Sequence, residues 1–343
     1  MEKLMELERW GKEIWPYLPG EIRGFLQPVL EKMHKSIYEI RIRLKRPLAL
    51  ESPYGTLFIS AGGTYGTLPQ EGVIMERPVL DKIFQLLSQC SVYAFEEELR
   101  QGYLTIPGGH RIGFVGKAVL DKGSIKALRS LAGYNYRICR QLNGVADRVL
   151  KYILGPDQSV YHTLIISPPG MGKTTLLREI ARRISNGVPE LNFGGLNVGV
   201  VDERSELAGC FMGEPQLDLG VRTDILDGCP KRDGMLMLLR SMGPAVIVTD
   251  ELGTERDLEA LEAVLNAGVK VMTTVHAGGL SDLAGRPGWR NILHRAVFER
   301  VIQLSRRHGV FYAEVTDCAK GQKLTNMPLI LGGGGNRENQ AIG

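Results

Sequence analysis

The sequence lacks a long apolar run, because no stretch approaches the roughly 18 consecutive apolar residues that a membrane-spanning helix requires. It also lacks paired cysteine spacings: its five cysteines are scattered without a C-x-x-C pattern. An odd number of scattered cysteines is typical of reduced thiols and argues against a disulfide framework or a zinc site. We therefore expect a cytosolic chain with no direct membrane insertion.

A strong charge of one sign is absent as well. The formal net charge is +4 and the pI of about 8.7 is only mildly basic. Charge alone therefore demands neither a nucleic-acid partner nor a membrane surface, and no stretch interleaves aromatic and basic residues. With 343 residues, 43% of them hydrophobic, the chain is long enough for two domains with cores of their own.

The first 141 residues predict a small α+β domain. Residues 1–35 have the spacing of helices with one apolar face that ends at Pro19-Gly20. Residues 37–70 alternate as short strands, a helix follows Pro78, and Gly108-Gly109 predicts a hairpin turn. The apolar helical face comprises Trp10, Ile14, Trp15 and Leu18.

A second domain is expected over residues 142–328. Its first helix begins after Leu142-Asn143-Gly144 and ends at Gly155-Pro156. Residues 329–343 include four successive glycines at 332–335 and few large apolar residues, which predicts a flexible tail.

The strongest motif lies near the start of this second domain. The apolar run 163–166 stops at a segment rich in proline and glycine, and helix-forming residues follow from 176. This order predicts the strand, loop and helix of a nucleotide-phosphate site. The motif residues are Ser167, Pro168, Pro169, Gly170, Met171, Gly172, Lys173, Thr174 and Thr175.

The chemistry of this loop assigns roles to its residues. Gly170 and Gly172 let backbone N–H groups converge on a phosphate, and the N-terminus of the following helix adds positive potential. Lys173 can reach the outer phosphates, and the Thr174 hydroxyl can ligate Mg²⁺. Ser167 replaces the usual first glycine of the motif, which removes some freedom at the loop entrance. A simple turn before an ordinary helix would not need this lysine and these threonines.

Two apolar strands further along end at acidic residues. Residues 196–201 lead to Asp202-Glu203-Arg204, and residues 245–249 lead to Asp250-Glu251. In an open α/β sheet the C-terminal ends of strands form the edge where ligands bind. We expect Asp250 to join Thr174 in holding Mg²⁺ and Glu251 to act as the base that polarises water, with Glu203 as its rival. Strand-end acids can also simply cap the following helices.

Other polar residues complete the set of candidates. His276 follows the strand 269–275, where it can sense the outermost phosphate or tie neighbouring strands together; a lone histidine is more often structural. Arg137 and Arg222 are favoured, among eight arginines, to stabilise the transferring phosphate from a neighbouring domain or subunit. No guanine-reading N-K-x-D motif is present, which favours ATP. The other arginines considered are Arg41, Arg43, Arg111, Arg140, Arg204 and Arg240.

The order of these motifs resembles the secretion ATPases of type II and type IV systems. Those proteins carry a phosphate loop, an acidic box, an acid-bearing strand and a histidine box, and here residues 167–175, 202–204, 240–251 and 274–276 follow in that order. The resemblance implies a RecA-like P-loop domain with a mostly parallel central sheet, a helix over residues 252–260, ATP and Mg²⁺ as cofactors, and a homo-hexameric ring. Asp250 departs from the small residue that is usual before the strand-end glutamate.

A closer resemblance is to the stage III sporulation AA family of endospore formers. It is carried by residues 38–48, 108–113, 136–138 and 222–231, so that it spans most of the chain. It implies a cytosolic ATPase at the channel between mother cell and forespore, which reaches the membrane through the membrane proteins of that channel. Two alternatives remain open: a nucleic-acid-stimulated motor, and a nucleotide-dependent assembly scaffold without significant turnover.

Overall fold

The computed structural model divides into two compact units. One unit comprises Met1–Arg140 with Gly209–Gln216, and the other comprises Gln141–Ala208 with Leu217–Gly343. Nothing in the sequence indicated that the segment Gly209–Gln216 belongs to the first unit. No helix in the described residues is long and apolar enough to cross a membrane. The structure describes residues 2–33, 37–88, 99–121, 123–286, 288–308 and 310–329.

The helices of the first unit bury the apolar face that the sequence predicts. Trp10, Ile14 and Leu18 are buried, and Trp15 packs against the same core with its ring centroid 5.7 Å from that of Trp10 in an edge-to-face arrangement. As expected, the helical run is interrupted before Gly20, where the next helix begins. The helical segments are α1 (Glu2–Glu13), η1 (Trp15–Tyr17), α2 (Gly20–Met33) and α3 (Arg77–Ser88).

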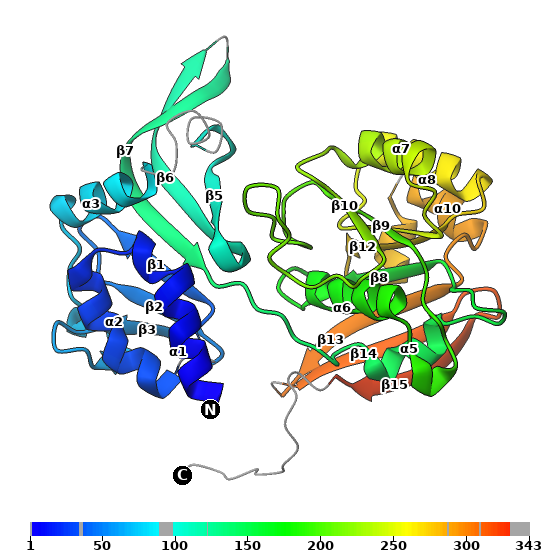
Figure 1. Ribbon diagram of the computed structural model, residues 1–343, viewed down its shortest axis with the longest axis horizontal. Helices are drawn as coiled ribbons and strands as arrows, with labels where there is room; N and C mark the ends of the chain where they lie inside the picture. The colour runs from blue at the N-terminus through cyan, green and yellow to red at the C-terminus, as the bar shows by residue number, and fades with distance from the viewer. Residues whose placement is uncertain are drawn as a thin grey trace. The chain divides into compact units, whose positions relative to one another are not determined.

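These helices pack on one antiparallel sheet (Figure 1). The sheet order is β4-β3-β2-β1-β7-β6-β5, and every neighbouring pair is antiparallel. The turn expected at Gly108-Gly109 is confirmed, and both glycines have positive φ angles, 78° and 74°. The strands are β1 (Glu39–Arg43), β2 (Ala49–Ser52), β3 (Gly55–Ile59), β4 (Tyr65–Gly66), β5 (Tyr103–Ile106), β6 (His110–Asp121) and β7 (Ser124–Arg137), with short helices η3 (Pro69–Glu71) and η4 (Pro107–Gly109).

The second unit is built on an eight-stranded sheet of order β10-β9-β11-β12-β8-β13-β14-β15. The pairs from β10 to β13 are parallel, and β14 and β15 add antiparallel pairs at one edge. The expected mostly parallel α/β sheet is confirmed, although the sheet as a whole is mixed. The strands are β8 (Thr163–Ser167), β9 (Val198–Asp202), β10 (Thr223–Asp227), β11 (Val246–Thr249), β12 (Lys270–His276), β13 (Arg300–Arg307), β14 (Val310–Asp317) and β15 (Gln322–Pro328).

Helices cover this sheet. Helix α6 packs on β8, β9 and β12, and α8 packs on β12 and α7. The helix expected from residue 252 begins instead at Glu255, because the Thr254 hydroxyl caps it and accepts the Asp257 N–H. The tail expected over 329–343 lies outside the described residues from 330 onward. The helices are α5 (Asp147–Ile153), α6 (Lys173–Asn186), η5 (Pro189–Leu191), α7 (Lys231–Ser241), α8 (Glu255–Asn266), α9 (Leu280–Ala284) and α10 (Trp289–His294).

His162 lies immediately before β8, next to the N-terminal end of β12, and folding keeps its ring neutral. His162 Nδ1 accepts the Val271 N–H at 3.1 Å. Burial, assisted by the Lys270 charge, lowers the pKa of His162 from 6.5 to about 4. The pKa of His162 is lower in the folded state than in the unfolded state. The stability that His162 contributes is therefore fully present above pH 6.5 and is lost as the pH falls toward 4.

The free energy of unfolding is therefore expected to fall by up to about 3 kcal/mol between pH 6.5 and pH 4 through His162 alone. Urea unfolding at a series of pH values measures this slope, which should become shallower in His162→Gln. The control His294→Gln changes an exposed histidine of α10 and should keep the wild-type slope. Equal slopes in all three proteins would contradict this account.

Candidate nucleotide site

The phosphate-loop motif forms the strand, loop and helix that the sequence predicts. Strand β8 ends at Ser167 and α6 begins at Lys173. Gly170 and Gly172 have φ angles of 75° and 83°, which favour glycine. No atom lies within 4 Å of a Cβ built on either residue, so these glycines are required by the backbone conformation and not by crowding. Pro168, Pro169 and Gly170 are exposed, Met171 is half-buried, and Thr175 lies in the first turn of α6.

The Lys173 ammonium lies beneath this loop. It is only 5% exposed and donates to the Ser167 carbonyl at 3.1 Å and the Pro168 carbonyl at 3.2 Å. It also lies 2.7 Å from His276 Nδ1. Burial lowers the pKa of Lys173 to about 8, against the opposing charge of Asp250. At neutral pH the lysine therefore keeps its proton for most of the time.

Thr174 and Asp250 meet where α6 begins and β11 has just ended. The Thr174 hydroxyl donates to Asp250 Oδ2 at 2.8 Å, and the Thr274 hydroxyl bonds to the other carboxylate oxygen. Thr274 Oγ1 also accepts the Glu251 N–H at 3.0 Å. Sequence reasoning included Thr274 in the histidine box but assigned no role to its hydroxyl, which is one of two threonine hydroxyls in β12. The structure thus brings together the two residues predicted to hold Mg²⁺.

His276 connects the loop lysine to Glu251. Its Nε2 pairs with Glu251 Oε1, while its Nδ1 faces Lys173. Burial and the Lys173 charge lower the pKa of His276, so the ring is neutral at pH 7. Because the lysine donates to Nδ1, the network assigns the ring proton to Nε2, which donates to Glu251.

Glu251 is held from three sides. Besides the His276 contact, Arg204 Nη1 lies 3.3 Å from Glu251 Oε2. The backbone N–H of Glu251 donates to the Thr274 hydroxyl. The Glu251 φ angle of 51° is in the left-handed region, which is unfavourable for a residue with a Cβ. The carboxylate therefore has a fixed position at the end of β11.

In the acidic segment Asp202-Glu203-Arg204, Asp202 has a structural role and Glu203 and Arg204 face the site. Asp202 is 1% exposed and accepts the backbone N–H groups of residues 206, 207 and 208 at 2.7–2.9 Å. Burial raises the pKa of Asp202 to about 6, although these hydrogen bonds act in the opposite direction. Arg178 of α6 donates to the carbonyls of Glu206 and Leu207, each at 2.6 Å. Together they fasten the segment 203–208 to the helix that follows the phosphate loop.

Glu203 lies beside the same site but has a different partner. It forms an ion pair with Lys231, a buried residue at the start of α7 that sequence reasoning did not single out. A cavity of about 630 Å³ is lined by Glu203, Lys231, Arg204, Glu251 and His276 among others. Both candidate bases therefore face one cavity, Glu203 opposite an ammonium and Glu251 opposite a neutral imidazole.

Of the two favoured arginines, Arg222 lies away from the phosphate loop within the second unit, and Arg137 belongs to the first unit, which does not contain the loop. Arg222 donates from Nη1 to the Ser185 carbonyl at 2.7 Å, at the last turn of α6, whereas the loop lies at its first turn. Arg137 lies on β7 of the first unit, where its side chain is 58% exposed and lies 3.5 Å from Glu39. Within the second unit no contact joins Arg222 to the loop, so the role of either arginine stays a prediction about a neighbouring copy or domain.

The residues present fit a nucleotide-bound Mg²⁺ and not an all-protein metal cage. Among the described residues, no group of three or more His, Cys, Asp and Glu side chains could hold a metal ion. Mg²⁺ in nucleotide sites takes only one or two protein ligands, the remainder being phosphate oxygens and waters. The Thr174 hydroxyl and the Asp250 carboxylate, 2.8 Å apart, supply that smaller set.

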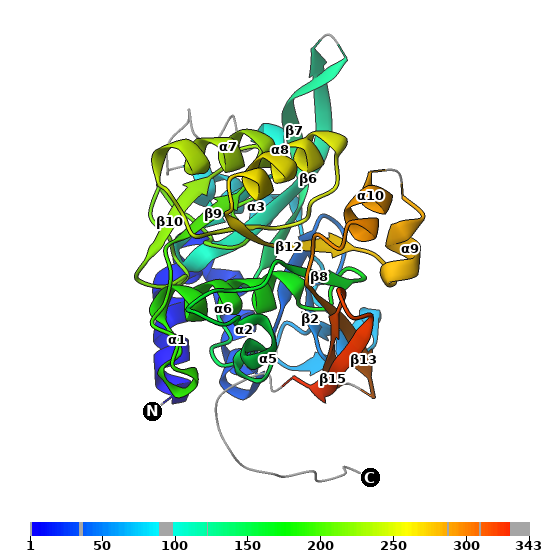
Figure 2. The same ribbon diagram turned by 90° about the vertical axis from the view of Figure 1, so that its right-hand side faces the viewer.

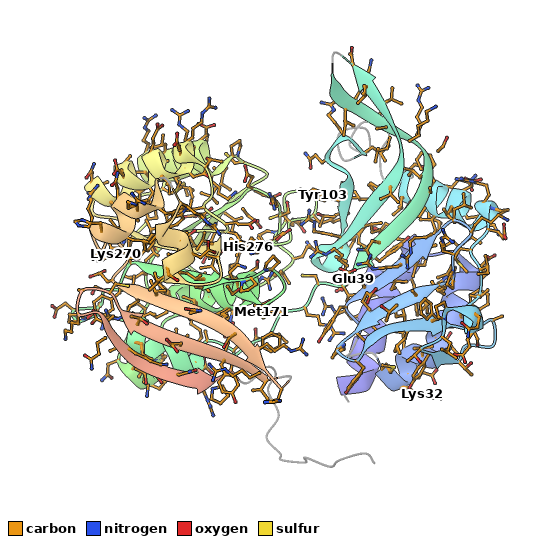
Figure 3. The ribbon with its side chains drawn as sticks, turned by 180° about the vertical axis from the view of Figure 1, so that it is seen from behind. Lys32, Glu39, Tyr103, Met171, Lys270 and His276 are labelled. Carbon is orange, nitrogen blue, oxygen red and sulfur yellow. The ribbon has the colours of Figure 1, made fainter. Side chains whose placement is uncertain are left out.

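Figure 3 shows the site and Lys270 at opposite ends of β12. Met171 of the loop and His276 lie at one end of the unit's strands, and Lys270 lies at the other end of β12. His276 pairs in register with Ser167, so the histidine box and the phosphate loop lie on adjacent strands.

Comparison with known proteins identifies the family. Residues 8–316 match the family model described as "Sporulation stage III, protein AA". The chain belongs to this family. Its relative in Bacillus subtilis (strain 168), Stage III sporulation protein AA, is 41% identical over 297 residues, which are 87% of this chain and 92% of that protein. The expected family is thereby confirmed.

Two solved ATPase structures are similar to the chain in fold. The ATPase DotB of Yersinia pseudotuberculosis aligns with a TM-score of 0.56 at 13% identity, covering 90% of this chain and 82% of that chain. DotB of Legionella pneumophila aligns with a TM-score of 0.51 at 15% identity, covering 82% and 77%. At such identities the likeness concerns the fold, and it confirms the expected fold class for this sporulation family member.

Asp202→Asn is expected to lower the free energy of unfolding by about 2 kcal/mol, because the amide offers one acceptor oxygen where three buried N–H groups need partners. Urea denaturation measures the change. The control Glu259→Gln removes an exposed carboxylate of α8 and should leave the midpoint within error of wild type. Indistinguishable midpoints for the two variants would show that Asp202 does not secure the segment.

Proposed function

We propose that this chain is a magnesium-dependent ATPase that acts as the cytosolic motor of a secretion-like channel. For a member of a stage III sporulation family, the channel would be the one between mother cell and forespore. The proposal combines the family membership with the geometry around the phosphate loop.

The observation that carries the proposal is the continuous contact from Lys173 through His276 to Glu251. A phosphate-binding lysine and a carboxylate are thus joined by one neutral imidazole. A turn before an ordinary helix would not bring a buried ammonium, a histidine and a strand-end carboxylate from three separate strand ends to one point. Phosphoryl transfer needs this combination of charge neutralisation and a positioned base.

Each residue then has a definite task. The backbone of the loop at Gly170–Gly172 and the start of α6 bind the phosphates. Lys173 donates to the outer phosphate oxygens. Thr174 and Asp250 would hold Mg²⁺, and the ion would supply neutralisation of phosphate charge there. Glu251 accepts a hydrogen bond from water and orients it toward the γ-phosphate. His276 fixes the carboxylate through its Nε2–H.

A homo-hexameric ring is part of the proposal. In such a ring a neighbouring copy would supply an arginine to the transferring phosphate, and Arg137 and Arg222 are the residues proposed. The cavity beside Glu251, about 630 Å³ in volume, provides room for such a side chain to approach. Membrane proteins of the channel are the proposed partners.

Steady-state phosphate release from ATP by the purified full chain tests the proposal, with oligomer mass measured by light scattering in parallel. Turnover that requires Mg²⁺ and accompanies a ring-sized mass is expected. ATP-dependent assembly without turnover, unchanged in Glu251→Gln, would instead support a scaffold. Turnover that rises only with nucleic acid and falls steeply with salt would support a nucleic-acid motor.

A further inference from the structure

The β6–β7 hairpin of the first unit extends far beyond the sheet that holds it. Strand β5 pairs with β6 only from His110 to Gly113, and β1 pairs with β7 only from Gly133 to Arg137. The two strands nevertheless continue to pair with each other as far as Asp121 and Ser124. Figure 2 shows this two-stranded ribbon projecting from the sheet. We call residues 115–130 the distal ribbon.

The distal ribbon exposes apolar side chains near its tip. Leu120 is 64% exposed and Ile125 is 48% exposed, and the two lie directly opposite each other across the strands. Directly opposed residues of an antiparallel pair share one face, as do residues two positions apart. On β6, Ala118 lies two positions from Leu120 and therefore on the same face; its partner across the ribbon is Leu128, and the register shifts between this pair and the Leu120–Ile125 pair. An isolated ribbon with such a face is only marginally stable in water.

Positive charge is concentrated on this same ribbon. Between residues 115 and 130 the sequence has four cations and one anion, a net charge of +3, whereas the whole chain carries +4. The one anion, Asp121, is partly offset by Lys126 at 3.9 Å. Lys117 and Arg129 lie opposite each other one step further from the tip. The cations are Lys117, Lys122, Lys126 and Arg129.

We propose that the distal ribbon is an arm that docks on an anionic lipid surface. The exposed Leu120 and Ile125 side chains would enter the boundary between headgroups and acyl chains. The flanking cations would lie at the headgroups, where each contributes roughly a five-fold increase in binding at low salt. A narrow apolar tip flanked by cations suits a membrane interface, whose chemistry is apolar below and anionic above. The arm provides a direct lipid contact, in addition to the contact through membrane proteins that the proposed function requires.

Vesicle flotation with the purified full chain tests this inference. Wild type is expected to float with phosphatidylcholine vesicles that contain phosphatidylglycerol, to float much less with pure phosphatidylcholine, and to be released by salt. Leu120→Ser/Ile125→Ser should lower the partition coefficient by on the order of ten-fold. Lys117→Gln/Lys126→Gln/Arg129→Gln should lower it by roughly 100-fold at low salt.

The matched control is Leu191→Ser/Val310→Ser, which removes two exposed apolar side chains of the second unit and should bind vesicles as wild type does. Because the ribbon residues are exposed, all variants should keep the wild-type unfolding midpoint and the wild-type ATP turnover. Equal flotation with both lipid compositions, or undiminished flotation of the serine variant, would overturn the proposal. So would flotation only with vesicles that carry a membrane protein, because the arm would then bind protein and not lipid.

Discussion

Replacement of Lys173 by alanine is expected to weaken ATP binding by a factor on the order of 10² to 10³. The buried Lys173 ammonium donates to two carbonyls of the loop, and each charge-assisted hydrogen bond to phosphate contributes about 1.5–3 kcal/mol. Isothermal titration with a slowly hydrolysed ATP analogue measures the loss. Turnover should disappear with binding.

A second readout shows whether the lysine acts through the contact seen here. The Lys173 charge lowers the pKa of His276, so removing it should raise that pKa toward the ordinary value, although burial continues to lower it. NMR titration of the His276 ring measures this shift. Lys270→Ala, at the opposite end of β12, is the control and should change neither the ATP affinity nor the titration (Figure 3). Wild-type affinity in Lys173→Ala would refute the nucleotide site.

Glu251→Gln is expected to keep ATP binding and to reduce turnover by a factor on the order of 10² to 10⁴, the range that one positioned acid–base group provides. Glutamine has nearly the same shape and its carbonyl oxygen can still accept from His276 Nε2, but it cannot attract the proton of the attacking water. Single-turnover phosphate release measures the loss. Bound ATP should then accumulate in the larger assembly.

Glu203→Gln separates the two candidate bases. Glu203 is paired with the buried Lys231, so its loss should leave an ammonium without its carboxylate and mainly reduce stability. We expect turnover in Glu203→Gln to stay well above that in Glu251→Gln. The reverse ranking would transfer the role of base to Glu203.

The elements that the sequence predicted well are those whose signals are local. The strand, loop and helix around Gly170 and Gly172 follow from apolar residues, glycines and helix formers in immediate succession. The start of α8 was placed too early, since the Thr254–Asp257 capping box decided it and apolar spacing did not. Arg222 was favoured as a phosphate-binding cation, yet within its own unit it is bonded to the far end of α6.

The sequence by itself determined that a phosphate loop, two acidic strand ends and a histidine strand end follow one another in an α/β unit. Tertiary structure decided which of them touch. Lys173 and His276 are 103 positions apart and meet because β12 lies between β11 and β8, an order that depends on how apolar strand faces pack together. The Lys231–Glu203 pair and the assignment of Gly209–Gln216 to the first unit depend on the same long-range packing, which no local pattern of residues records.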